Sequence, residues 1–374
     1  MPDRTGSQTT IQPPKRLLFG PGPSMVEPRV YLAMAQPVVG HLDPYFFEVL
    51  GEVRRLLRVA FGTTNEFTVA ISGTGSAGME TAVGNFVEPE SKFAVFANGY
   101  FCDRLTEIGK RQGAQVVRLE KPWGETFTYD EAAEFLHRER PDTVAFVHAE
   151  TSTGALQEPA AICKAAREVD ALVIADTVTS LGGVPVKVDE HGIDVAYSCT
   201  QKGLSCPPGL SPFTASPRAL ERLKARTSAV REWYLDLKLL AEFYDGRKYH
   251  HTASSTLFYA LCEGLRVVEE EGWQARFARH VRNHREFVRG LEKLGLVMHV
   301  AEGMRIPTLN TPRLPNGMDD AKVRKHLLDR YGIEIAGGFG PLAGKILRIG
   351  LMGPLSSESC VALFLNALEE ALAA

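Results

Sequence analysis

The stretch "ALVIADTVTSLGGVPVKVDEHGIDVAYSCTQK" (residues 171–202) contains two short apolar runs, and a polar side chain follows each of them. The first run ends at Asp176, and the second, Val195–Tyr197, leads through four small or polar residues to Lys202. Apolar runs without polar alternation are typical of strands that are buried on both faces of a parallel sheet. The stretch therefore predicts two such strands, one ending at a carboxylate and the other leading to an amine.

Similar apolar runs occur earlier in the chain, at residues 66–72, 92–98 and 143–150, and helical patterns separate them. This alternation predicts an α/β protein with a mostly parallel sheet that helices cover on both faces. In such sheets, ligands bind at the carboxyl ends of the strands. Functional residues are therefore expected at 73–76, 98–101, 150–153, Asp176 and Lys202.

The pattern changes after about residue 255, where helical segments alternate with short strands such as "LVMHV" and "KILRIGLM". This second pattern predicts a smaller α+β domain. We expect residues 1–16 to form an extended arm, residues 17–270 a large domain, and residues 271–374 the small domain.

The composition favours a protein that works in a reducing aqueous compartment. The formal net charge of −3 gives no indication of binding to nucleic acid or to an anionic membrane. No apolar run approaches the roughly 18 residues of a membrane-spanning helix, and the first ten residues lack the apolar run of a secretory signal. The six cysteines are scattered without a CxxC pair, so we expect buried free thiols and a cytoplasmic location.

His280 and His284 stand four residues apart in a predicted helix, which is a spacing that metal ligands use. Their surroundings, "RFARHVRNHREF", are rich in arginine and provide no carboxylate on the same turn. We therefore expect a solvated helix face here and no metal site.

The segment "SGTGSAG" (residues 72–78) places three glycines after a predicted strand and before a predicted helix. Backbone N–H groups at such a helix start bind phosphate. A dinucleotide site would also need an acidic residue at the end of the next strand, and Asn98-Gly99-Tyr100-Phe101 stands there instead. A phosphate-binding turn is therefore favoured over a dinucleotide site, and a purely structural glycine turn remains the alternative.

Asp176 and Lys202 each have an ordinary interpretation, as a helix N-cap and as a surface lysine. Together, at neighbouring strand ends, they could present a carboxylate and an amine to one ligand. A lysine amine forms a Schiff base with an aldehyde when part of it is neutral. An aldehyde cofactor with a phosphate tail and a cationic ring nitrogen fits the glycine turn, the lysine and the aspartate, and that description matches pyridoxal phosphate.

Several motifs in this order resemble the class V aminotransferases of fold type I, and in particular their alanine–glyoxylate and serine–pyruvate branch. They are "LLFGPGPS", "SGTGSAGMET", "FANGYF", "AETSTG", "ADTVTSLGG", "SCTQKGLSCPPG", "KYHHT" and "GGFGPLAGKILRIGLMG". The resemblance runs from residue 17 almost to the C-terminus. It implies a seven-stranded, mostly parallel sheet in the large domain, pyridoxal 5'-phosphate as cofactor, and a homodimer whose active sites are shared between subunits.

The resemblance also implies a role for particular residues. Lys202 would bond to the cofactor aldehyde, and Asp176 would pair with its ring nitrogen. Arg348 would grip the substrate carboxylate at a mouth lined by Gly22, and Tyr249 and Thr252 would reach the phosphate bound in the neighbouring subunit. The remaining cofactor contacts would come from Thr74, Gly75, Ser76, Phe101, Thr151 and Gln201.

Two of these positions depart from the pattern of the family's animal members. Phe101 replaces a tryptophan that stacks on the cofactor, and Ser76 replaces a histidine. Phenylalanine still offers a flat face, although a smaller one. We expect these changes to affect cofactor affinity and substrate preference and to leave the chemistry intact.

The expected activity is a ping-pong transfer of an amino group from a small amino acid, with alanine as the first choice and serine as the second, to glyoxylate or pyruvate. Ureidoglycine ranks lower as donor because enzymes of the family that use it have asparagine where His250 stands. Cysteine desulfurase ranks lower still, because it needs a loop cysteine before the carboxylate-binding arginine, whereas Cys360 follows Arg348 within a predicted helix. A nonenzymatic nucleotide-binding module is the remaining alternative.

Overall fold

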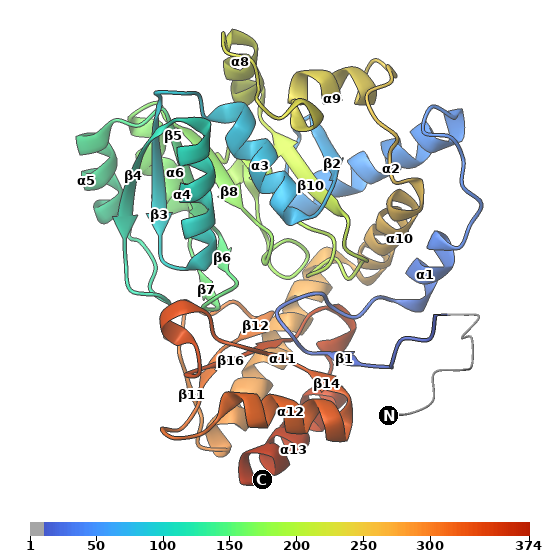
Figure 1. The fold of residues 1–374 in the computed structure, drawn as a ribbon, viewed down its shortest axis with the longest axis vertical. Coiled ribbons are helices and arrows are strands. Elements are labelled where there is room, and N and C mark those ends of the chain that lie inside the picture. The colour runs from blue at the N-terminus through green and yellow to red at the C-terminus, as the bar shows by residue number, and fades with distance from the viewer. Residues whose placement is uncertain (1–10) are drawn as a thin grey trace, which may run out of the picture.

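A computed structural model describes residues 11–374, and its largest sheet has seven strands in the order β2-β10-β9-β8-β5-β3-β4 (Figure 1). All of them run in the same direction except β10, which is antiparallel to both of its neighbours. The prediction of an α/β fold with a mostly parallel seven-stranded sheet is confirmed. The strands are β2 (Thr68–Ser72), β3 (Lys92–Ala97), β4 (Gln115–Glu120), β5 (Thr143–Val147), β8 (Leu172–Asp176), β9 (Val195–Tyr197) and β10 (Leu210–Ala215).

The five apolar runs correspond to β2, β3, β5, β8 and β9, but β4 and β10 were not predicted. Strand β4, "QVVRLE", lies at the sheet edge and is only partly buried, so its apolar signal is weak. Strand β10, "LSPFTA", contains Pro212, a residue that is unusual inside a sheet. Its carbonyl nevertheless accepts a hydrogen bond from the Ser198 N–H, so the proline is accommodated next to β9.

Helices α3 and α4 share one face of this sheet, where they pack against each other. Helix α3 contacts β8, β9 and β10, and α4 contacts β3, β4 and β5. Helix α6 contacts β8 and packs against α5. The helices up to residue 271 are α1 (Pro28–Met34), α2 (Pro44–Phe61), α3 (Gly75–Phe86), α4 (Tyr100–Gln112), α5 (Tyr129–Glu139), α6 (Pro159–Glu168), α7 (Val188–His191), α8 (Pro217–Ala225), α9 (Leu237–Tyr244) and α10 (Ser255–Glu271).

Glycines let α3 begin very close to the sheet. A Cβ atom on Gly78 would lie 2.0 Å from Ser211 Oγ, and one on Gly75 would lie 3.1 Å from Cys199 Cβ. These approaches leave no room for a side chain, which explains why small residues open the helix. The close packing brings the N-terminus of α3 to the edge of the sheet at which β9 ends.

A second group of elements lies below the large sheet in Figure 1, drawn in orange and red. Its buried apolar cluster contains Phe19 and residues between Phe287 and Ala371, whereas the first cluster runs from Val30 to Leu265. The remaining elements of the described chain, not all of which belong to this second group, are α11 (Trp273–Lys293), α12 (Asp320–Tyr331), α13 (Glu358–Ala373), the 3-10 helices Trp233–Leu235, Gly340–Leu342 and Gly353–Leu355, and the short strands β1 (Leu17–Leu18), β6 (Ala149–Glu150), β7 (Ala155–Leu156), β11 (Val297–Met298), β12 (Leu309–Asn310), β13 (Pro312–Arg313), β14 (Ile333–Glu334), β15 (Ala336–Gly337) and β16 (Leu347–Gly350). The domain boundaries proposed above stay a prediction, and residues 1–10 of the predicted arm lie outside the described residues.

The prediction of a solvated face at His280 and His284 is wrong, because both side chains are buried on the inner face of α11. His280 donates from Nδ1 to the Arg276 carbonyl at 2.8 Å and accepts the Gly353 N–H at Nε2. His284 Nδ1 lies 2.7 Å from Asn310 Oδ1. Burial lowers the pKa of His280 to about 3, so it is a neutral packing residue. Of the arginines that suggested a solvated face, Arg282 and Arg285 are exposed, whereas Arg279 is partly buried and Arg276 is buried.

Candidate active site

Lys202 lies in the loop that follows β9, and its side chain is only 7 % exposed. Its amine donates hydrogen bonds to Thr151 Oγ1 at 2.8 Å and to Thr179 Oγ1 at 2.9 Å. The two threonine hydroxyls also bond to each other. Burial excludes the interpretation as an ordinary surface lysine, and the amine is held by two neutral hydroxyls.

Burial lowers the pKa of the Lys202 amine, because a charged ammonium loses its hydration there. Cys199, Asp176 and Glu150 oppose this shift electrostatically, and the positive charge of Arg348 adds to it. A larger fraction of the amine is therefore neutral than in an exposed lysine. A neutral amine is the form that attacks a carbonyl carbon.

Asp176 ends β8 and is 3 % exposed. Its Oδ2 accepts a hydrogen bond from the Tyr197 hydroxyl and its Oδ1 one from the Val178 N–H, both at 2.8 Å. Burial raises the pKa of this carboxyl, and the two hydrogen bonds oppose that rise. Within residues 11–374, Asp176 has no ion-pair partner, so a cation placed beside it would relieve its unfavourable burial. The segment after it turns without forming a helix, so Asp176 caps no helix.

The glycine turn forms an open cup at the N-terminus of α3. The side chains of Thr74 and Ser76 are exposed there, whereas Gly75 is buried. Arg104 of α4 donates to Ser76 Oγ at 3.0 Å and so brings a positive charge to the cup. Gln201 Oε1 is buried without a hydrogen-bond partner among the described residues. A helix N-terminus with free N–H groups, hydroxyls and a nearby guanidinium suits a phosphate group.

Phe101 presents a flat ring on the same side of the sheet. The Lys202 amine lies 5.8 Å from the centre of this ring, and the Arg104 guanidinium carbon lies 4.9 Å from it. The buried carboxylate of Glu150 accepts the Phe101 N–H at 3.2 Å and thereby fixes the start of α4. A flat ligand in this space would lie close to both the ring and the amine.

Arg348 of β16 reaches the cluster from the second group of elements and is 4 % exposed. Its Nε donates to the Gly337 carbonyl at 2.7 Å and its Nη1 to the Thr151 carbonyl at 3.3 Å. Burial lowers its pKa to about 10, so it stays charged at neutral pH. The Phe339 ring covers one face of the guanidinium, with 3.8 Å between the ring centre and Cζ. This arrangement leaves in-plane N–H groups of Arg348 for a carboxylate.

Gly22 borders the lysine directly. A Cβ atom at this position would lie 3.0 Å from Lys202 Cγ, and the residue has a φ of +120° that favours glycine. Lys202, Asp176, Thr151, Gly22 and Arg348 thus converge on one region. Tyr249 and Thr252 are different, because both are exposed and neither bonds to the cup within the described chain.

Three further residues belong to this cluster although the sequence had not marked them as site residues. Thr179 accepts from the Lys202 amine, Tyr197 donates to Asp176, and Arg104 donates to Ser76. Glu150, which lies in the predicted segment 150–153, holds the start of α4. Tyr197 ends β9, so its position at the carboxyl edge of the sheet was a usable signal. Thr179 and Arg104 gave no such signal, because only the fold brings them to the site.

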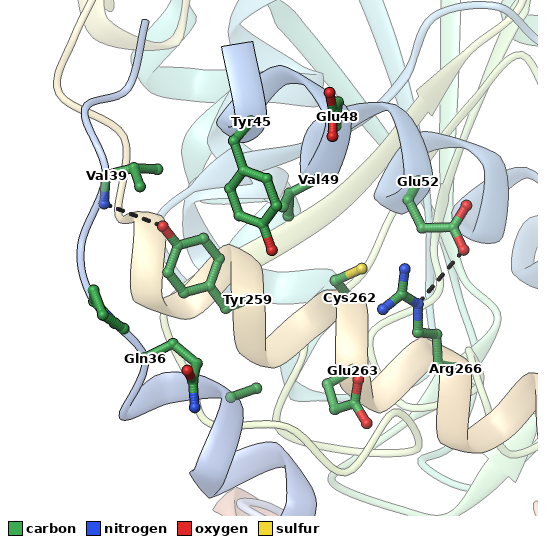
Figure 2. Close-up of a pocket in the computed structure, with 12 residues that line it drawn as sticks. Gln36, Val39, Tyr45, Glu48, Val49, Glu52, Tyr259, Cys262, Glu263 and Arg266 are labelled. Carbon is green, nitrogen blue, oxygen red and sulfur yellow. Dashed lines mark hydrogen bonds and ion pairs between the residues drawn. The ribbon is translucent and has the colours of Figure 1, made fainter. Parts of the chain in front are cut away.

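A separate cavity of about 430 Å³ lies between α1, α2 and α10 (Figure 2). Glu48, Glu52, Glu263 and Arg266 line it, with Tyr45 and Tyr259 pointing toward its interior. None of the predicted site residues lines this cavity. Residues 11–374 contain no group of three side chains placed to hold a metal ion and no helix long and apolar enough to cross a membrane.

Comparisons with known proteins agree on one family. The family model described as "Aminotransferase class-V" matches residues 18–348. The chain is 39% identical to the (S)-ureidoglycine–glyoxylate transaminase of Bacillus subtilis, over 96% of this chain and 91% of that protein. It is 38% identical to the alanine–glyoxylate aminotransferase of Oryctolagus cuniculus, over 96% of this chain and 93% of that protein. The crystal structure of an alanine–glyoxylate aminotransferase from Nostoc sp. superposes with a TM-score of 0.95 at 46% identity, covering 97% of this chain and 96% of that one.

Proposed function

The chain belongs to the class V aminotransferases, and we propose that it moves the amino group of alanine, or of serine, to glyoxylate or pyruvate. The enzymes of this family depend on pyridoxal phosphate. The observation that supports the proposal best is the buried Lys202 amine with a lowered pKa, close to the buried Asp176 and the open cup of α3.

The residues present fit this cofactor. Asp176 is a buried carboxyl without a cationic partner in the described chain, and a protonated ring nitrogen would supply one. Thr74, Gly75 and Ser76 at the helix start, with the unpartnered Gln201, would hold the phosphate. Phe101 would cover one ring face, and Thr151 would lie at the ring's hydroxyl side. When bound, the cofactor draws in the electron pair that the substrate Cα–H bond leaves behind.

Two residues then act on the substrate itself. Lys202 would hold the cofactor through its amine, and the same amine, when free, would move the proton at the substrate Cα. Arg348 grips the substrate carboxylate with a pair of N–H groups and so fixes Cα in front of that amine. Donor and acceptor use the same site in turn, so we expect ping-pong kinetics.

The amino-donor half-reaction tests the proposed function directly. Alanine added to the purified protein should remove the visible absorption of the bound cofactor, and glyoxylate should restore it. A nucleotide-binding module would give no such response. The B. subtilis relative supports ureidoglycine as a second candidate donor, so a panel of alanine, serine and ureidoglycine against glyoxylate and pyruvate decides between them. A preference for ureidoglycine would overturn the alanine assignment and leave the transaminase assignment intact.

Replacing Arg348 with lysine should raise the KM for alanine about 10- to 100-fold and change kcat much less. Lysine keeps the charge but offers a single nitrogen, so it cannot match both carboxylate oxygens as guanidinium does. Steady-state kinetics checks this result. The exposed arginine of β13 provides the control, because Arg313→Lys should leave the KM unchanged. An unchanged KM in Arg348→Lys would contradict the proposed role.

We also propose a homodimer in which Tyr249 and Thr252 complete the partner's phosphate cup. Tyr249 is 64 % exposed, and an apolar group that includes Tyr31, Leu32, Val38, Leu42 and Tyr45 is exposed on α1, at the start of α2 and between them. Exposed apolar groups of this kind often mark interfaces.

Sedimentation should give twice the chain mass of 41.0 kDa. A mixture of refolded Lys202→Ala and Tyr249→Ala chains should exceed the activity of either variant alone, because one site of each hybrid is intact. A monomer, or no gain on mixing, would contradict the proposal.

A cytoplasmic location is proposed on the state of the cysteines. All six are free, and five of them are buried. Free thiols persist in a reducing compartment. Fractionation of the source cells would test this location.

A further inference from the structure

Arg276, near the start of α11, is a buried arginine that joins separate segments of the chain. It is 3 % exposed, and its three nitrogens reach three different acceptors. Nε donates to the Gly182 carbonyl at 2.9 Å, Nη2 to the Gly203 carbonyl at 2.6 Å, and Nη1 to Glu271 at 2.8 Å. Only a guanidinium presents donors in such a fixed fork.

The two carbonyls belong to the segments that hold the Lys202 amine. Gly203 follows Lys202 in the chain, and Gly182 closes the turn that carries Thr179, whose hydroxyl accepts from the amine at 2.9 Å. The segments also touch backbone to backbone, since a Cβ atom on Gly203 would lie 2.3 Å from the Leu181 carbonyl oxygen. Arg276 therefore links the backbone segment of Lys202 to the segment of Thr179, one of the two hydroxyl partners of the amine.

The charge of Arg276 does not by itself explain its burial. Burial lowers its pKa, and the Glu271 carboxylate opposes that shift. Buried ion pairs contribute little net stability compared with apolar packing, because both charges lose their hydration. Glu271 also pairs with Arg279, which lies one turn further along α11. The distinctive contribution of Arg276 is thus the pair of hydrogen bonds to the carbonyls of Gly182 and Gly203.

We propose that Arg276 is a positioning residue that fixes the Lys202 and Thr179 segments against each other and so keeps the lysine amine in its buried place. The proposal rests on the function proposed above, because it concerns the amine that would bond to the cofactor. Without the guanidinium, the two segments separate, water reaches the amine, and Lys202 behaves more like an ordinary lysine.

Arg276→Gln removes the link while leaving Glu271 paired with Arg279. Arg276→Lys keeps a positive charge next to Glu271. Its single side-chain nitrogen, however, replaces the three nitrogens of Arg276 that bond to Glu271 and to the carbonyls of Gly182 and Gly203. Arg279→Gln is the matched control, because Arg279 shares Glu271 but bonds to the carbonyls of Gly353 and Ser356. The charged or titratable groups that act on Lys202, namely Cys199, Asp176, Glu150 and Arg348, remain unchanged in all three variants.

The measurement is the rate at which cofactor-free protein develops visible absorption after pyridoxal phosphate is added, followed over a range of pH. In Arg276→Gln and Arg276→Lys, the midpoint of this pH profile should rise by about one unit, and the rate at neutral pH should fall about tenfold. Arg279→Gln should match the wild type. In steady-state assays, kcat should fall in the Arg276 variants while the KM for alanine stays within about threefold, because Arg348 is untouched.

The outcomes separate this inference from the proposed function. If the wild type develops no absorption with pyridoxal phosphate, the proposed function fails. If the wild type responds and either folded Arg276 variant shows the wild-type midpoint, the positioning role is overturned. An equal shift in Arg279→Gln would also overturn it, because the effect would then be a general consequence of disturbing α11. Arg276→Lys provides the test if Arg276→Gln does not fold.

Discussion

Lys202→Ala should lower turnover by roughly five orders of magnitude or more while the protein still folds. The substitution removes both the nitrogen that would bond to the cofactor and the base that would move the Cα proton. No neighbouring side chain can replace it, because the groups next to the amine are the hydroxyls of Thr151 and Thr179. Single-turnover assays with alanine measure the loss, and circular dichroism checks the fold.

The folded state should tolerate this change because Lys202 is a costly residue to bury. Its lowered pKa means that the unfolded chain binds more protons than the native one, so this group destabilises the apo protein below its usual pKa of 10.5. Lys202→Met, which fills the same space without an amine, should therefore melt no lower than the wild-type apoprotein at neutral pH. Lys224→Ala, at an exposed lysine paired with Glu221, is the control with normal turnover. Normal turnover in Lys202→Ala would refute the assignment.

Asp176→Asn should lower kcat/KM about a hundred- to a thousandfold. The amide has nearly the shape of the carboxylate but no charge with which to hold a protonated ring nitrogen. The Val178 N–H can still donate to the amide oxygen, and the Tyr197 hydroxyl can accept from the amide nitrogen, so the site should keep its shape. Kinetics and a cofactor-binding titration together measure the effect. Asp170→Asn, at an exposed acid paired with Arg218, should leave both quantities unchanged.

The same substitution should have the opposite effect on the stability of the cofactor-free protein. Burial raises the pKa of Asp176 above its usual 3.8, so the native state binds more protons than the unfolded state and loses stability as the pH rises from that value. A neutral amide at this position carries no such penalty. We expect Asp176→Asn apoprotein to melt about 1–3 °C higher than wild type at neutral pH, with the difference shrinking toward pH 4. A lower melting temperature of Asp176→Asn than of wild type at neutral pH would contradict this prediction, because it would show that the buried charge of Asp176 stabilises the apoprotein.

The sequence predicted the parallel sheet and the proximity of Asp176 to Lys202 because both follow from the pattern of buried parallel strands. Buried strands read as apolar runs, and the carboxyl ends of parallel strands meet at one edge. β8 and β9 are indeed adjacent and parallel, in a register that pairs Asp176 with Tyr197. Arg348, far away in the chain, was assigned through the family resemblance and not through any local pattern.

Other features were beyond local patterns for physical reasons. β10 contains a proline although it lies inside the sheet. His280 and His284 are buried on a helix whose arginine-rich composition is typical of a solvent-exposed helix. Whether a histidine or arginine is buried depends on which carbonyls and N–H groups the fold places in front of it, as at Gly353 for His280 and at Gly203 for Arg276. Such long-range partners leave no periodic trace in the sequence.

The most direct test of the account is to reduce the purified enzyme with borohydride in the presence of pyridoxal phosphate and to map the labelled peptide by mass spectrometry. The account predicts a pyridoxyl group on the peptide that contains Lys202, in a yield approaching one per chain, and none in Lys202→Met. Label on another lysine, or an equal yield in Lys202→Met, would contradict it.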